Sequence, residues 1–137
     1  GLLEFERRTG GSDGVRAARR SAEQYLLERS LFRRKSTGEV ARADYLDFAF
    51  PYYWHYDVLR ALDYFRRAGG ERDERMAEAV EVVRSKQQPD GRWLLDRIHP
   101  GQVHFDLEGS VGTPSRWNTL RALRVLEWWQ AAPLRVN

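Results

Sequence analysis

The sequence predicts an all-α fold in which outer and inner helices alternate as repeated pairs. Three observations predict it: an internal repeat, apolar residues at helical spacing, and Pro and Gly residues that divide the chain into segments of helical length. The repeat is clearest where Leu59-Arg60-Ala61-Leu62 recurs, 61 residues later, as Leu120-Arg121-Ala122-Leu123. Other similar residues pair at the same offset: Val15 with Met76, Ala18 with Ala79, Ala22 with Val83, and Phe32 with Trp93.

The repeat divides the chain, which we expect to be one domain, into four segments. Residues 1–11 should be the end of a preceding inner helix, residues 12–70 the first helix pair, residues 71–132 the second pair, and residues 133–137 a tail. The first segment is assigned because the pattern before Gly10-Gly11 returns before Gly69-Gly70, 59 residues later. A chain that opens inside a helix and lacks an initiating Met is expected to be a piece of a longer protein.

The outer helix of each pair comes first. Ser12-Asp13 are good N-cap residues, so the first outer helix should start there and end near residue 29. The second should start near Asp73 and end near Gln87, where Pro89-Asp90-Gly91 predicts a turn. Their narrow apolar stripes predict an outer position.

The inner helix of each pair follows a proline. The first is predicted from residue 52, after Pro51, to about residue 68, and the second from residue 115, after Pro114, to about residue 132. Both carry large apolar residues on more than one face, so they should be buried on several sides. Two pairs leave the inner face open, which predicts either self-association or a missing chain segment beside it.

Composition excludes several classes of protein. With 42% hydrophobic and 31% charged residues and no apolar run of bilayer length, the chain fits neither disorder nor a membrane span. The absence of Cys excludes disulfides and thiolate metal sites and fits a reducing compartment, so we expect a cytoplasmic location. Basic residues alternate with acidic ones, as in Glu71-Arg72-Asp73-Glu74-Arg75, so no basic face for nucleic acid is expected.

One stretch carries a family resemblance. Gln87-Gln88-Pro89-Asp90-Gly91-Arg92-Trp93 fits Q-x-x-x-G-x-W, the end of the repeat motif of squalene and oxidosqualene cyclases. The chain thus resembles the superfamily of terpenoid cyclases and protein prenyltransferases, and the resemblance implies a segment of an α/α toroid. It implies structural roles for three residues: Gln87 bridges backbone groups of the next helix, Gly91 permits a tight turn, and Trp93 stacks on the helix end.

The catalytic motifs of that superfamily are absent. No D-x-D-D acid motif and no D-D-x-x-D metal motif occur, since Asp44-Tyr45-Leu46-Asp47 is only D-x-x-D, and a zinc site that needs Cys is excluded. The resemblance therefore implies a fold without implying a reaction, and no cofactor is predicted.

Candidate ligand-binding residues lie where the inner helices begin. The first helix carries His55, Asp57 and Arg60, and the second repeats this partly with Asn118 and Arg121. As a functional site they would face a cavity between the inner helices, with the aromatic residues Trp54 and Trp117 at its mouth. In the structural interpretation, Asp57 caps its helix and pairs with Arg60. Their repetition in both units favours this structural role.

The second long loop supplies further candidates. In an extended strand His104, Asp106 and Glu108 would point to one side, where they could bind a divalent metal or act as acid and base. Because no second cluster with matching spacing exists, we favour instead a loop held by hydrogen bonds with Phe105 and Leu107 buried, and we predict no metal.

Three functions remain open at this point. The first is a toroid that holds an apolar, isoprenoid-sized ligand between its inner helices. The second is a non-catalytic helical-repeat module that binds a protein partner. The third, a glycan-processing α/α barrel, requires a pair of carboxylates about 5–10 Å apart in a groove.

Overall fold

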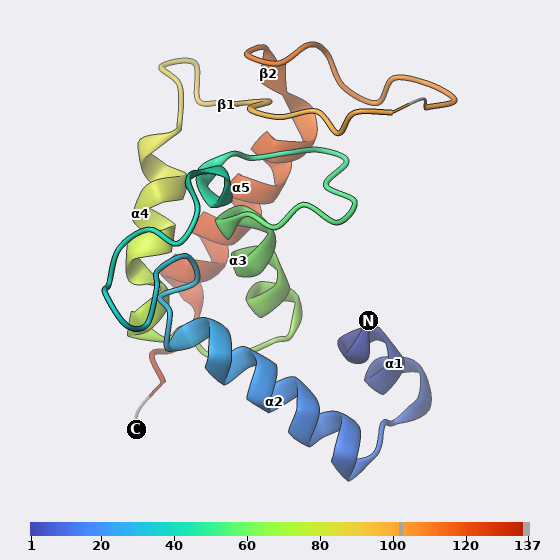
Figure 1. The fold of residues 1–137 in the computed structure, drawn as a ribbon, viewed down its shortest axis with the longest axis vertical. Helices are drawn as coiled ribbons and strands as arrows, with labels where there is room; N and C mark the ends of the chain where they lie inside the picture. The colour runs from blue at the N-terminus through green and yellow to red at the C-terminus, as the bar shows by residue number, and fades with distance from the viewer. Residues whose placement is uncertain (102, 136–137) are drawn as a thin grey trace.

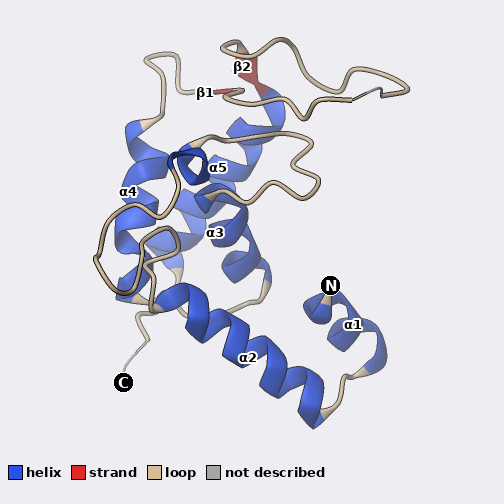
Figure 2. Ribbon diagram, viewed as in Figure 1, coloured by secondary structure: helices blue, strands red, loops and turns tan. Residues whose placement is uncertain are grey.

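The computed structural model describes residues 1–101 and 103–135, and within them the protein is mostly helical (Figures 1 and 2). The five α-helices are α1 (Leu2–Thr9), α2 (Asp13–Leu27), α3 (Val58–Arg67), α4 (Ala77–Ser85) and α5 (Arg116–Ala131). Two short 3-10 helices, η1 (Ala43–Leu46) and η2 (Glu74–Met76), and two short strands, β1 (Trp93–Leu94) and β2 (Pro114–Ser115), complete it. The described residues do not close into a ring. None of their helices is both long enough and apolar enough to span a bilayer.

Helices α3, α4 and α5 pack together as the body of the molecule. Figure 1 shows α3 and α5 starting on the side of the long loops and running the same way, with α4 running in the opposite direction. At the opposite side of the body, the segment after α3 is joined to the segment after α5, because the backbone N–H of Arg72 donates to the carbonyl of Pro133 at 3.0 Å. Helices α1 and α2 form a hairpin that reaches away from this body, and α1 contributes no buried residue.

A single apolar core joins these helices to the loop that follows α2. Its members share exposed fractions below one tenth: Leu27, Leu31, Phe32, Phe48, Val58, Leu59, Ala61, Leu62, Phe65, Met76, Ala79, Val80, Val83, Trp93, Ala122, Val125 and Trp129. The core therefore lies between α3, α4 and α5, and α2 reaches it only at its C-terminal end.

Several helix ends lie where the internal repeat predicts them. Ser12 caps α2 by accepting the N–H of Val15, and Asp73, at the 61-residue offset, caps η2 by accepting the N–H of Arg75. Gly10 after α1 and Gly69 after α3 both have positive φ angles, 78° and 72°, as a left-handed C-terminal turn requires.

The start of α3 differs from the prediction by six residues. The helix begins at Val58 because the Asp57 carboxylate accepts the backbone N–H of Arg60 at 2.7 Å and so caps it there. Before it, Tyr53 has a left-handed φ of 40°, which no α-helix accommodates. The guanidinium of Arg60 donates to the carbonyls of Tyr53 and His55, at 2.9 and 2.7 Å, and so holds residues 53–55 as a turn.

Two strands also differ from the all-α prediction. In the antiparallel pair of β1 and β2, Trp93 lies opposite Ser115. The pair closes the base of the loop at residues 95–113 and brings it to the start of α5. Two residues per strand are too few to produce an alternating pattern in the sequence.

The motif residues lie in the turn between α4 and β1. The Trp93 side chain is fully buried, and its indole N–H donates to the carbonyl of Val83 in the last turn of α4 at 2.7 Å. Gly91 has a φ of 81°, which favours glycine. The Gln87 amide donates to the carbonyl of Gly91 at 3.2 Å, so it bridges its own turn. The resemblance had implied a bridge to the next helix instead.

Equivalent leucines of the two repeats provide a test of this packing. Leu62 in α3 is fully buried, whereas Leu123 in α5 is 49% exposed. We expect Leu62→Ala to lower the free energy of unfolding by about 2–5 kcal/mol, because it leaves a cavity in the core. The matched variant Leu123→Ala should lower it by less than about 1 kcal/mol. Urea unfolding measures both, and equal losses would contradict the packing described above.

Candidate functional site

The polar residues at the starts of α3 and α5 form hydrogen bonds to one backbone segment, Phe48 and Ala49. The Asp57 carboxylate accepts the N–H of Ala49 at 3.3 Å, and Arg121 donates to the carbonyl of Ala49 at 3.4 Å. The Asn118 amide donates to the carbonyl of Phe48 at 3.1 Å. Side chains from both inner helices thus hold the same two residues of the first long loop.

Burial sets the electrostatics of this network. Asp57 is fully buried, and loss of hydration raises the pKa of its carboxyl above the usual range, although the charge of Arg121 opposes the shift. Arg121 is only 7% exposed, and desolvation lowers the pKa of its guanidinium. The imidazole Nε2 of His55 lies 3.9 Å from the Asp57 carboxylate and 2.9 Å from the carbonyl oxygen of Asp47.

These contacts give structural roles to several predicted ligand-binding residues. Asp57 and Asn118 are fully buried, and Arg60 holds the turn before α3. The guanidinium carbons of Arg60 and Arg121 lie 4.4 and 4.8 Å from the ring centre of Tyr52. Asp57, Asn118 and Arg121 are therefore buried inside the fold. His55 and Arg60 are partly exposed, and His55 lines a pocket described below.

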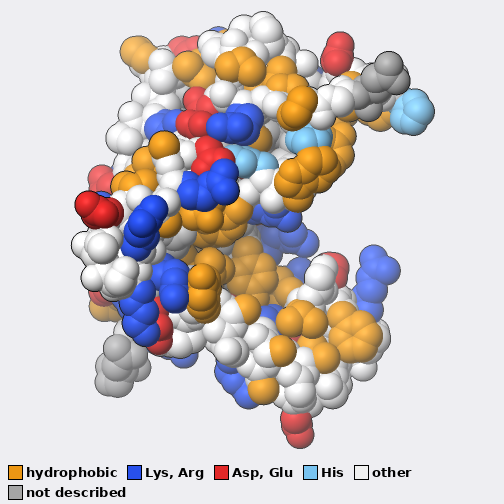
Figure 3. All heavy atoms as spheres, in the orientation of Figure 1, with side chains coloured by type: hydrophobic (Ala, Val, Ile, Leu, Met, Phe, Trp, Pro, Cys, Tyr) orange, Lys and Arg blue, Asp and Glu red, His pale blue; other side chains and the backbone are white. Residues whose placement is uncertain are grey.

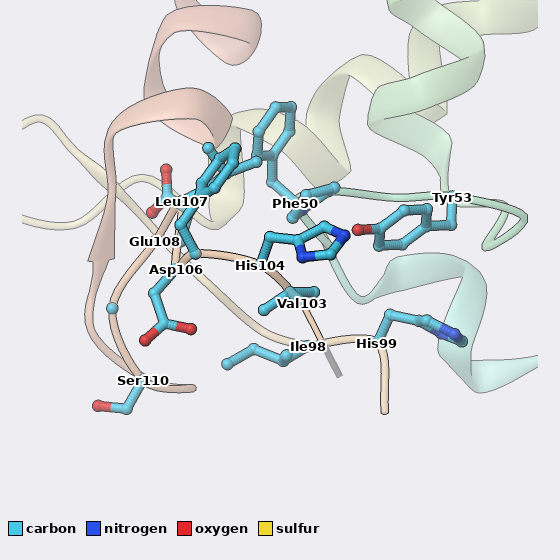
Figure 4. A pocket seen from close by; sticks show the side chains of 13 residues that line it. Phe50, Tyr53, Ile98, His99, Val103, His104, Asp106, Leu107, Glu108 and Ser110 are labelled. Atoms are coloured by element: carbon cyan, nitrogen blue, oxygen red, sulfur yellow. The ribbon is translucent and has the colours of Figure 1, made fainter. Parts of the chain in front are cut away.

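An open pocket of about 590 Å³ lies on the loop side of this network. Its lining comes from residues 50–53, from residues 98–99 and from residues 103–110, and is mostly apolar or aromatic: Phe50, Pro51, Tyr53, Ile98, His99, Val103, His104, Phe105, Asp106, Leu107, Glu108, Gly109 and Ser110. Figure 4 shows the Tyr53 hydroxyl pointing toward the His104 imidazole across this space. Figure 3 shows hydrophobic side chains and imidazoles gathered on this side of the surface.

The predicted row of His104, Asp106 and Glu108 does not form. Figure 4 shows the carboxylates of Asp106 and Glu108 pointing in different directions. One oxygen of Glu108 accepts the backbone N–H of Trp117 at 3.0 Å, in the first turn of α5. Among residues 1–101 and 103–135, no three His, Asp or Glu side chains are grouped to hold a metal ion. Phe105 and Leu107 are 69% and 36% exposed, so the expectation that both are buried was wrong.

The two predicted aromatic residues border the pocket without lining it. Trp117 stacks on Phe50 with ring centres 5.1 Å apart. Trp54 is 75% exposed and meets His99 edge-on, with ring centres 3.8 Å apart. Trp54 lines a neighbouring pocket of about 530 Å³ that also contains His55 and shares His99 with the first.

Sequence reasoning missed the residues that line most of the pocket. Ile98, Val103 and Phe105 lie in a loop without helical or strand periodicity, so no spacing rule selects them. One usable signal was the run of adjacent aromatic residues that contains Tyr53, because neighbours in a chain cannot all face the same core.

The raised pKa of Asp57 predicts a specific pH dependence. The native state binds this proton more tightly than the unfolded chain, so the carboxyl stabilises the fold most below its unfolded pKa of about 3.9. That contribution is lost as pH rises through the native pKa. Relative to Asp57→Asn, which does not ionise, the unfolding free energy of the wild-type protein should fall as pH rises from 3 toward neutral. Urea unfolding of both proteins across this range measures the difference.

Asp90 provides a control with the opposite sign. Hydrogen bonds from the backbone N–H and guanidinium of Arg92 lower the pKa of the Asp90 carboxyl. The wild-type protein should therefore gain stability relative to Asp90→Asn as pH rises. A difference curve for Asp57 that also rose with pH would contradict the assignment.

No protein-family model, no curated protein and no solved structure matches this chain. The resemblance to terpenoid cyclases therefore rests on the Gln87–Trp93 motif and the internal repeat.

Proposed function

We propose that this chain is a segment of an α/α toroid that binds an apolar, isoprenoid-sized molecule. The proposed site is the pocket at the loop side of α3 and α5, and not a cavity between the inner helices. The observation that carries the proposal is the lining of that pocket, in which large apolar side chains remain open to solvent. We propose binding without a reaction, in keeping with the missing acid and metal motifs.

The exposure of the lining residues supports a ligand of this kind. Tyr53, Ile98 and Val103 are 47%, 47% and 49% exposed, and Phe105 is 69% exposed. Apolar side chains grouped at a hollow mark binding sites more often than apolar residues scattered singly over a surface. The volume of about 590 Å³ lies in the usual range of small-molecule sites.

Anchored loop ends support the same proposal. The first lining segment follows Phe48 and Ala49, whose backbone groups form hydrogen bonds with Asp57, Asn118 and Arg121. The second begins and ends near the β1–β2 pair. A ligand would thus meet a partly preformed site, which reduces the entropy lost on binding.

Polar groups in the pocket are few and would orient a ligand. Tyr53 and His104 lie across from each other, and the Asp106 carboxylate stands apart from them (Figure 4). A hydroxyl or similar small polar group on an otherwise apolar ligand would find a donor and an acceptor there.

The exposed face of α5 favours a second candidate, a helical-repeat module that binds a protein partner. Trp117, Leu120 and Leu123 are 40%, 37% and 49% exposed along this helix. In α3 the repeat equivalents of the two leucines, Leu59 and Leu62, are fully buried. A face that is buried in one repeat and open in the next is suited to contact with another helix.

Titration with farnesol, an isoprenoid alcohol, tests the first candidate. Ile98 borders both pockets, and Ile98→Asp places a charge in the apolar wall. We expect this variant to bind farnesol at least about tenfold more weakly than the wild-type protein, because ligand binding would bury the new carboxylate. Calorimetry below the aggregation concentration of farnesol measures the affinity.

The matched control is Leu123→Asp, an exposed leucine of α5 outside the pocket. It should leave farnesol binding unchanged. Absence of saturable binding to the wild-type protein, or equal weakening by both substitutions, would contradict the pocket proposal. If Leu123→Asp weakens binding to a protein partner and Ile98→Asp does not, the second candidate is favoured.

A further inference from the structure

One edge of a buried arginine has no partner among the described residues. Arg121 is 7% exposed, and its Nε and Nη2 atoms are buried and make no hydrogen bond there. Its two hydrogen bonds both come from Nη1 and are long, 3.4 Å to the carbonyl of Ala49 and 3.3 Å to the side-chain oxygen of Asn118. Buried donors without a partner are uncommon in folded proteins, so this edge requires an explanation.

The two free atoms are those that recognise an oxyanion. Nε–H and the outward N–H of Nη2 lie side by side on a planar guanidinium, and they point in parallel. Two oxygens of a carboxylate or phosphate group match this spacing and accept both bonds together. The unpartnered part of Arg121 is therefore one complete bidentate edge.

Nearby carboxylates of the chain are engaged elsewhere. Asp57 directs its oxygens at the backbone N–H groups of Ala49 and Arg60. Asp63, whose charge also acts on Arg121, accepts two hydrogen bonds from Arg66 at 3.0 and 2.9 Å. Neither carboxylate forms an ion pair with Arg121 within 4.0 Å.

A second cation and an aromatic ring lie close to the Arg121 guanidinium. The guanidinium carbons of Arg60 and Arg121 lie within 5 Å of the ring centre of Tyr52, at 4.4 and 4.8 Å. Tyr52 belongs to the turn before α3 and not to a helix, so a change in its side-chain position does not require a helix to unfold.

We propose that this edge of Arg121 binds an oxyanion, a carboxylate or phosphate group, and that the Tyr52 ring covers the site when it is empty. Arg60 supplies the second positive charge. Because none of these three residues lines the pocket of about 590 Å³, the site is separate from the proposed isoprenoid site and does not rest on it.

Side-chain NMR of the wild-type protein tests the proposal directly. Inorganic phosphate and acetate are titrated separately, at an ionic strength held constant with sodium chloride. We expect the Nε–H resonance of Arg121 to shift saturably with one of the two anions, and the anion that acts identifies phosphate or carboxylate as the ligand class. If neither anion shifts the resonance up to about 50 mM, the dissociation constant is too weak for a specific site and the proposal is overturned.

Two variants test whether anion binding requires the bidentate edge or only a positive charge. Arg121→Lys keeps the positive charge but removes the edge, whereas Arg124→Lys makes the same change at an exposed position of α5. The active anion should raise the melting temperature of the wild-type protein and of Arg124→Lys, but not of Arg121→Lys. Equal stabilisation of all three would overturn the proposal. If Arg121→Lys does not fold, contacts between the Nε–H proton and the Tyr52 ring assign the resonance, and the wild-type titration decides alone.

Discussion

The hydrogen bonding of Phe48 and Ala49 by side chains at the starts of α3 and α5 is the interaction on which the rest of the structure depends. Asp57 of the α3 cap accepts the backbone N–H of Ala49, and Arg121 of α5 donates to the backbone carbonyl of the same residue. The Asp96 carboxylate, just after β1, accepts the N–H of Phe48 at 2.8 Å. One extended segment thereby joins two helices and both long loops, and its backbone groups are satisfied without a larger sheet.

This arrangement explains why the polar stripe is repeated in both units. A buried backbone segment requires partners, and side chains at the first turns of two parallel helices are placed to provide them. The cost is two buried charges, Asp57 and Arg121, which are not in direct contact. Each has a pKa shifted by desolvation in the direction that disfavours its charge. The network thus stabilises the loop at some expense in hydration, and it leaves one arginine edge unused.

The sequence predicted the helices better than the site, for a physical reason. Helical periodicity, the caps Ser12 and Asp73 and the turn at Gly69 are local signals, and the structure follows them. The start of α3 was misplaced because Asp57 ends a turn that a side chain holds: the guanidinium of Arg60 donates back to two carbonyls of that turn. Among the candidate residues, the burial of Asp57, Asn118 and Arg121 depends on a loop segment whose position no spacing rule predicts.

The pocket was missed because it is a product of the two loops meeting, not of either one alone. The lining residues at 50–53 and those at 98–99 and 103–110 are separated by α3 and α4 in the chain, and they meet because α3 and α5 start on the same side of the body. The parallel arrangement of α3 and α5 places the long loop before each of them on that side. Helix packing decides where the loops gather, and loop composition decides what the resulting surface binds. The core at Leu62 and the pocket lining at Ile98 therefore lie in separate parts of the structure.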